Sequence, residues 1–237
     1  MQTEYLQNDL ILLQAERLFP LGTDAMVLAD FAQAPRGAAV CDLCAGGGAV
    51  GLLMMAADPT LRVTAVELQA PACALMEQTR EKNGLAGRFT VLQGDIREIR
   101  ALLPQGSFRH VVCNPPYYPA GSGAEPEDEA QAIARTERFC SFEDVCRAAR
   151  WLLPTGGSLW LVHRPERLAE LCCELRAAGL EPKRLRAVCP RPGSAPSLLL
   201  LRAVRGGKPG LDWQAPLTLA DETGQPTEEY RRIYHMD

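Results

Sequence analysis

The chain has 237 residues, of which 47% are hydrophobic and 23% are charged, and its net charge is −4. This composition is typical of a globular protein with room for one large α/β domain, and the acidic balance argues against indiscriminate binding to nucleic acid. It excludes a membrane-spanning helix, because no stretch approaches roughly 18 uninterrupted apolar residues, and a disulfide scaffold, because the nine cysteines are scattered through apolar runs such as Leu171-Cys172-Cys173.

In chain order, the first residues lack the basic region and apolar core of a secretion signal. Together with cysteines interpreted as buried free thiols, this predicts a cytoplasmic protein without membrane contact. Residues 1–36 are expected to pack on the core, with a helix over 25–31 that Thr23 or Asp24 caps. From residue 37 to 208, strand-length and helix-length segments alternate. Strands are predicted at 38–43, 62–66, 89–92, 108–113, 158–162, 185–188 and 197–202, and helices at 49–57, 70–83, 142–153 and 165–178.

This alternation predicts an α/β fold with a doubly wound, mostly parallel sheet of seven strands. The last two strands are joined by the loop 189–196, which is too short for a helix, so the terminal pair should be antiparallel. Residues 37–208 are therefore expected to form the main domain. The glycines around Pro209 end it and leave a polar tail over 209–237.

A glycine-rich turn follows the first strand of this domain. Gly46-x-Gly48-x-x-Gly51 satisfies the dinucleotide-binding pattern, with Glu67 at the expected distance. However, Asp42 stands at the strand end, where it would repel a pyrophosphate. An acid there suits the ammonium of S-adenosylmethionine, which carries no phosphate. Glu67 is then predicted to accept the ribose hydroxyls. Asp95, which ends the third strand, is predicted to accept near the adenine amino group.

The run Asn114-Pro115-Pro116-Tyr117 follows the fourth strand, about 70 residues after the glycine turn. The prolines fix φ and aim backbone carbonyls as acceptors, the Asn114 side-chain oxygen is a second acceptor, and Tyr117 offers a ring for stacking. Two acceptors can hold both hydrogens of a planar amino group and leave its nitrogen open to an electrophile. The run therefore predicts methylation of an amino nitrogen.

Charge is unevenly distributed beyond this run. Residues 182–208 contain seven basic side chains and no acidic one, whereas Glu125 to Glu129 contains four acids. The basic segment is interpreted either as a solvated surface or as a phosphate-binding face. Cys41 and Cys44 form one C-x-x-C, but no second pair or histidine cluster completes a metal site, so no metal is expected. No catalytic role is assigned to His110, His163 or His235.

These motifs together resemble class I S-adenosylmethionine-dependent methyltransferases with an NPPY motif. More closely, residues 5–208 resemble the bacterial tRNA1(Val) adenine-N6 methyltransferase family, which modifies the adenine beside the anticodon. Supporting segments are 19–25, 134–137, 161–168 and 182–186. The pair Cys44-Ala45 departs from the Gly-Thr usual in the family. The resemblance implies a Rossmann-like fold in which residues 37–208 are the S-adenosylmethionine-binding catalytic domain. It implies cofactor contacts from Asp42, Cys44, Gly46, Gly48, Glu67, Leu68, Asp95, Ile96 and Asn114.

The expected activity is N6-methylation of an adenine in structured RNA, most simply tRNA, by a monomer or weak dimer. Asn114, Pro115, Pro116 and Tyr117 would carry the chemistry. RNA contacts are expected from Tyr118, Arg135, Lys183, Arg184, Arg186 and Arg191. Two alternatives stay open: methylation of a protein glutamine amide, which presents the same NH2 group, and a binding protein that holds cofactor or RNA without turnover.

Overall fold

A mixed β-sheet with helices on both faces forms the core of the molecule. The computed structural model describes residues 2–14, 21–117 and 140–236. Within them, nine strands form one sheet in the order β10-β8-β9-β7-β6-β3-β4-β5, with β11 paired to β8. The strands are β3 (Ala39–Leu43), β4 (Arg62–Glu67), β5 (Phe89–Gln93), β6 (His110–Cys113), β7 (Ser158–His163), β8 (Leu180–Cys189), β9 (Leu198–Arg205), β10 (Asp212–Trp213) and β11 (Leu217–Thr218).

The seven predicted strands are all present, and the α/β fold class is confirmed. Strands β3 to β7 run parallel, and β9 is antiparallel to both of its neighbours, β7 and β8. Strand β8 is longer than predicted because it begins at Leu180, with an irregular register between Pro182 and Arg184. Strands β10 and β11 were not predicted, because each has two residues and pairs only with the edge of β8.

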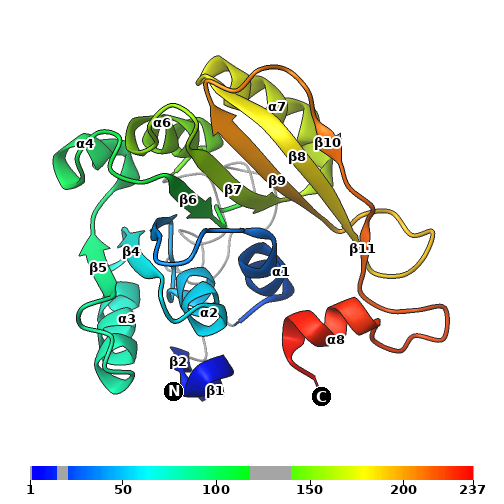
Figure 1. Ribbon diagram of the computed structural model, residues 1–237, viewed down its shortest axis with the longest axis horizontal. Coiled ribbons are helices and arrows are strands. Elements are labelled where there is room, and N and C mark those ends of the chain that lie inside the picture. The colour runs from blue at the N-terminus through cyan, green and yellow to red at the C-terminus, as the bar shows by residue number, and fades with distance from the viewer. Residues whose placement is uncertain (1, 15–20, 118–139, 237) are drawn as a thin grey trace, which may run out of the picture.

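Two apolar cores cover the two faces of the sheet, and Figure 1 shows the helices in two groups. Helices α1 (Thr23–Phe31), α2 (Ala49–Ala57) and α3 (Ala70–Lys82) pack on one face, and α4 (Ile99–Leu102), α6 (Phe142–Leu152) and α7 (Leu168–Ala177) pack on the other. Neighbouring strand residues alternate between the cores: Trp160 faces the α1 side and Leu161 the α6 side. This is the doubly wound arrangement, and it buries Trp160 as core.

The N-terminal segment packs on α3 as a hairpin of β1 (Gln2–Tyr5) and β2 (Ile11–Gln14). The Asn83 side chain accepts the N–H of Ile11 and donates to its carbonyl oxygen, with N···O distances of 2.8 and 2.7 Å. Because Leu12 and Leu13 are almost fully buried, the apolar patch at the start of the chain belongs to the folded protein.

The tail that the sequence marks as polar is folded. After β10 and β11 it forms α8 (Glu228–Tyr234), which lies beside α1 and buries Ile233 in the α1-side core. Arg186 on β8 forms a two-pronged ion pair with Glu229, and Arg232 does the same with Asp30. Two ion pairs and one buried apolar residue therefore hold this segment against β8 and α1. The polar composition of the tail does not indicate this packing.

All nine cysteines are free thiols, as predicted. Five are buried, but Cys173 is exposed, because its position on α7 faces away from the core. The interpretation of every thiol as buried was therefore wrong for this residue. Among the described helices none is both long and apolar enough to cross a membrane.

Candidate active site at the ends of the parallel strands

The sheet reverses its strand order between β3 and β6. From β3 the chain proceeds outward through β4 and β5 and then returns to build β6 and β7 on the other side. Leu43 at the end of β3 pairs with Cys113 at the end of β6. The glycine-rich turn and the Asn114 run therefore leave the sheet side by side, at the position where open α/β sheets bind ligands.

Asp42 is a buried carboxyl group just before the turn. Its Oδ2 accepts the Gly51 N–H at the start of α2, with an N···O distance of 3.1 Å. Burial raises the pKa of Asp42 to about 7; the Gly51 hydrogen bond works in the opposite direction, and the nearby Glu67 adds to the rise. The carboxyl group is therefore poised to ionise when a cationic partner approaches.

Glu67 ends β4 and faces the same turn. Its two oxygens accept the backbone N–H groups of Gly46 and Gln69, with N···O distances of 2.8 and 2.9 Å. Burial raises the pKa of Glu67, although these backbone donors lower it in part. Each carboxylate oxygen keeps a further lone pair, so Glu67 can still accept from a ligand.

The turn itself has left-handed backbone at three positions: Cys44, Gly46 and Gly48. Gly48 has a φ of +80°, and a Cβ there would lie 3.0 Å from Met76 and 3.1 Å from Phe89. A Cβ at Gly51 would meet Val63 at 2.7 Å. The side chains packed against the turn therefore leave no room for a Cβ at Gly48 or Gly51. At Gly48 the left-handed backbone also favours glycine.

Asp95 and Ile96 follow the end of β5, and Leu68 follows the end of β4, so all three lie at the same edge of the sheet. Asp95 accepts from the Arg97 backbone and pairs with its guanidinium. Burial alone would raise the pKa of Asp95, but the Arg97 hydrogen bonds and charge lower it below its ordinary value. Ile96 is buried, whereas Leu68 is a large apolar side chain that remains exposed. An exposed leucine beside Glu67 offers a surface for an apolar ligand face.

Asn114 and Tyr117 converge on a third side chain, Asp24 of α1. Asp24 Oδ2 lies 3.1 Å from Asn114 Nδ2 and 3.1 Å from the Tyr117 hydroxyl oxygen. Tyr117 also donates to Asn114 Oδ1. The sequence analysis gave Thr23 or Asp24 only as a helix cap, and this was wrong: the N-cap of α1 is Gly22, and Thr23 and Asp24 lie inside its first turn. The signal available was its position in the segment 19–25 that resembles the family.

The ring of Tyr117 packs against a cluster of other aromatic rings. The ring of His163 at the end of β7 meets Tyr117 edge to face, with centroids 5.2 Å apart, and meets Phe142 at 5.7 Å. Burial lowers the pKa of His163 to about 4, so the ring is neutral near pH 7. This contact gives His163 a packing role beside the site that the sequence did not reveal.

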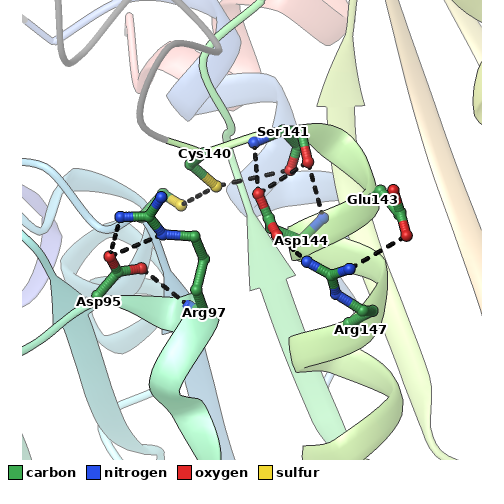
Figure 2. Close-up of polar contacts among 8 residues, drawn as sticks. Asp95, Arg97, Cys140, Ser141, Glu143, Asp144 and Arg147 are labelled. Carbon is green, nitrogen blue, oxygen red and sulfur yellow. Dashed lines mark hydrogen bonds and ion pairs between the residues drawn. The ribbon is translucent and has the colours of Figure 1, made fainter.

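The start of α6 lies beside Asp95 and Arg97, as Figure 2 shows. Ser141 and Asp144 form a capping box, in which each side chain accepts the backbone N–H of the other residue. Cys140 precedes it, with its sulfur 3.8 Å from that of Cys44. Cys140 therefore lies directly against the glycine turn. The expected RNA contacts Tyr118 and Arg135 lie outside the described residues.

Of the four other residues expected to contact RNA, three have side chains that form hydrogen bonds or ion pairs within the protein. Lys183 donates to the Lys208 and Gly210 carbonyls, Arg184 pairs with Asp212, and Arg186 pairs with Glu229. Arg191 is exposed in the β8–β9 loop. The register joins Val188 to Leu198, and Leu199 to His163, so this loop leaves the sheet at the same end as the Asn114 run.

Comparison with known proteins shows what this chain is similar to. The family model of the methyltransferase small domain matches residues 20–172. The chain is 29% identical to tRNA1(Val) (adenine(37)-N6)-methyltransferase of Parabacteroides distasonis, covering 90% of this chain and 88% of the relative. The identically named protein of Shewanella amazonensis is 30% identical, covering 79% and 78%. The crystal structure of a predicted O-methyltransferase from Agrobacterium tumefaciens matches with a TM-score of 0.71 at 27% identity, covering 90% of this chain and 96% of that one.

Proposed function

The chain belongs to the methyltransferase small domain family, and from this membership we propose that it is an RNA adenine-N6 methyltransferase whose substrate is a tRNA. The observation that carries the proposal is the pairing of Leu43 with Cys113, which sets the Asn114 run beside the glycine turn. An acceptor pair for an amine and the residues that would hold a cofactor thereby share one end of the sheet.

The residues present fit S-adenosylmethionine as the methyl donor. When bound, it supplies a methyl group on a positively charged sulfur, which leaves as a neutral thioether. Asp42 and Glu67 are buried carboxyl groups, and burial raises the pKa of each, so a cationic ligand would stabilise their charged forms. Asp42, Gly46, Gly48 and Glu67, with Cys44, Leu68, Asp95, Ile96 and Asn114 around them, would hold it.

Asn114 would orient the amine for transfer. The adenine amino nitrogen is a poor nucleophile because its lone pair is delocalised into the ring. Hydrogen bonds from its two N–H groups to Asn114 Oδ1 and the Pro115 carbonyl favour a pyramidal nitrogen with a free lone pair. Such orientation contributes up to roughly 7–11 kcal/mol in ideal intramolecular cases. The nitrogen gains the methyl group and then loses a proton to water, so no side-chain base is required.

Tyr117 would receive the base after it leaves its stack. Stacking of a base on an aromatic ring contributes about 1–3 kcal/mol. In the free protein Tyr117 contacts His163 edge to face, and its hydroxyl is held by Asp24. The ring is therefore positioned before the substrate arrives, which supports a substrate with a planar aromatic amine over a glutamine side chain.

Methyl transfer from labelled cofactor tests the proposal. We expect tritium from S-adenosylmethionine to enter total tRNA and to be recovered as N6-methyladenosine. Asn114→Ala should lower turnover at least ~100-fold, the effect of losing one preorganised polar partner, and should weaken cofactor affinity measured by calorimetry by a much smaller factor, because Asn114 lies at the periphery of the cofactor contacts. Label in protein would favour the glutamine alternative, label on a hydroxyl would favour oxygen methylation, and cofactor binding without transfer would favour a binding protein.

A further inference from the structure

Asp24 is the one side chain that contacts both polar groups of the amine-binding run among the described residues. It comes from α1, about 90 residues earlier in the chain, and it lies in the first turn of that helix. There the helix dipole favours a negative charge. Its Oδ1 accepts the Ala25 N–H at 2.9 Å, and its Oδ2 faces Asn114 and Tyr117. The carboxylate is thus held on one side by its own helix and directed into the site on the other.

Glycine at position 22 leaves room for this arrangement. A Cβ at Gly22 would lie 2.3 Å from Asp24 Oδ1, far inside any normal contact. The backbone of Gly22 has a φ of −99°, which any residue can adopt. Glycine is therefore required at position 22 to leave space for the Asp24 carboxylate. The backbone conformation alone would accept any residue.

We propose that Asp24 is a positioning residue for methyl transfer, acting through the orientation of the Asn114 amide; this rests on the proposed function. A carboxylate only accepts hydrogen bonds, so the Asn114 NH2 must face Asp24 and the Asn114 oxygen must face away from it. The opposite orientation would point an NH2 group at the substrate amine. Asp24 thereby selects the orientation in which Asn114 can accept.

The Tyr117 hydroxyl benefits from the same carboxylate. It has one hydrogen and two acceptors within reach, Asn114 Oδ1 and Asp24 Oδ2. When a substrate amine donates to Asn114 Oδ1, the hydroxyl hydrogen can rotate to Asp24 while the ring stays in place. Asp24 therefore keeps a half-buried hydroxyl partnered in both states.

Asp24→Asn tests the inference, because it keeps the shape and adds a competing NH2 group. We expect turnover at saturating tRNA to fall about 10–100-fold, by analogy with residues that orient a metal ligand through a hydrogen bond. The tRNA KM and the cofactor dissociation constant should change less than about threefold. Asp30→Asn is the matched control: it is on the same helix but pairs with Arg232 at the surface, and it should leave turnover unchanged.

A second background separates positioning from folding. In an Asn114→Ser protein there is no amide to orient, so adding Asp24→Asn should cost little further turnover. Equal losses from Asp24→Asn in the wild-type and Asn114→Ser backgrounds, or a wild-type rate for Asp24→Asn alone, would overturn the inference. Gly22→Ala keeps the carboxylate but displaces it, and a rate within twofold of wild type would count against the inference as well.

A readout without substrate distinguishes this inference from the proposed function. Burial and then the charge and hydrogen bond of Asp24 raise the pKa of Tyr117 well above its ordinary value, against a lowering by Arg164. Alkaline titration of tyrosinate absorbance, with Tyr117→Phe identifying the signal, should therefore show a lower pKa for Tyr117 in Asp24→Asn. If this shift occurs but no RNA is methylated, the contact network stands and the substrate assignment falls. If the Tyr117 titration does not move, the network itself is wrong.

Discussion

Asp42 is buried at the end of β3 with no cationic side chain paired to it in the described part of the chain. A carboxyl group in this setting stays protonated to a higher pH than it would in water. Its energetic consequence differs from that of a surface acid such as Asp58, whose pKa is lowered by hydrogen bonds from Thr60. Ionisation of an aspartate is therefore disfavoured by folding at position 42 and favoured by folding at position 58.

We predict that Asp42 makes the ligand-free protein less stable as pH rises. Its folded pKa of about 7 lies above the ordinary value of 3.8. The stability that the neutral form contributes is present below about pH 4 and is lost as pH rises to about 7. The loss is at most on the order of 4 kcal/mol, from about three pKa units. Urea unfolding between pH 4 and 7.5 should show the stability of wild type falling relative to Asp42→Asn.

Asp58→Asn serves as the control for this experiment. Because the pKa of Asp58 is lowered, its contribution is present above its unfolded pKa and should be flat between about pH 5 and 7. S-adenosylmethionine affinity of wild type, measured by calorimetry, should rise through about pH 7 as Asp42 ionises, and it should lose that rise in Asp42→Asn. Parallel stability curves for wild type and Asp42→Asn would contradict the assignment.

The turn between β3 and α2 is the element on which the proposed cofactor-binding edge depends. Strand β5 and helix α3 press on it from behind through Phe89 and Met76, which lie against Gly48. The turn is therefore held by packing as well as by the hydrogen bonds of Asp42 and Glu67. Its shape is fixed before a ligand binds, which lowers the ordering cost of binding.

Gly48→Ala should disrupt this element. The left-handed backbone alone costs about 1–2 kcal/mol for a residue with a Cβ. Overpacking against Met76 and Phe89 should add about 1–3 kcal/mol. Gly84→Ala is the matched control, since Gly84 has a φ of +63° but nothing near its Cβ position, and it should show only the backbone cost. Equal losses in urea unfolding would mean that the neighbours relax without cost.

At the scale of the whole molecule, the basic segment divides into two roles. Arg186 holds α8 through Glu229, and Lys183 holds the turn after β9 through two carbonyls. Arg191 is exposed at the end of the sheet where the Asn114 run lies. Position in the fold, more than the number of charges, therefore favours Arg191 as a phosphate contact.

Salt titration of tRNA binding tests this division. If Arg191 contacts a phosphate, Arg191→Ala should reduce the slope of log affinity against log salt by about one unit and raise the tRNA KM without changing turnover at saturation. Lys183→Ala, which removes the same charge from a side chain with internal partners, should change the slope less. Superimposed titrations for wild type and Arg191→Ala would show that this loop is only solvated.

The sequence by itself determined the strand and helix order, the glycine turn and the acceptor run after the fourth parallel strand. These follow from local patterns: apolar runs bounded by glycine and proline, and polar residues at fixed distances after them. The seven strands and the antiparallel last pair were therefore predictable. Each depends on neighbours within a few residues or on the general rules of α/β folds.

Only the tertiary structure brought Asp24 to Asn114 and Tyr117, set His163 against Tyr117, and paired Arg186 with Glu229. These contacts join residues far apart in the chain, so their existence depends on which strands and helices become neighbours. Local periodicity carries no such information. Burial, which raises the pKa of Asp42 and lowers that of His163, is likewise a property of the packed molecule and of no segment taken alone.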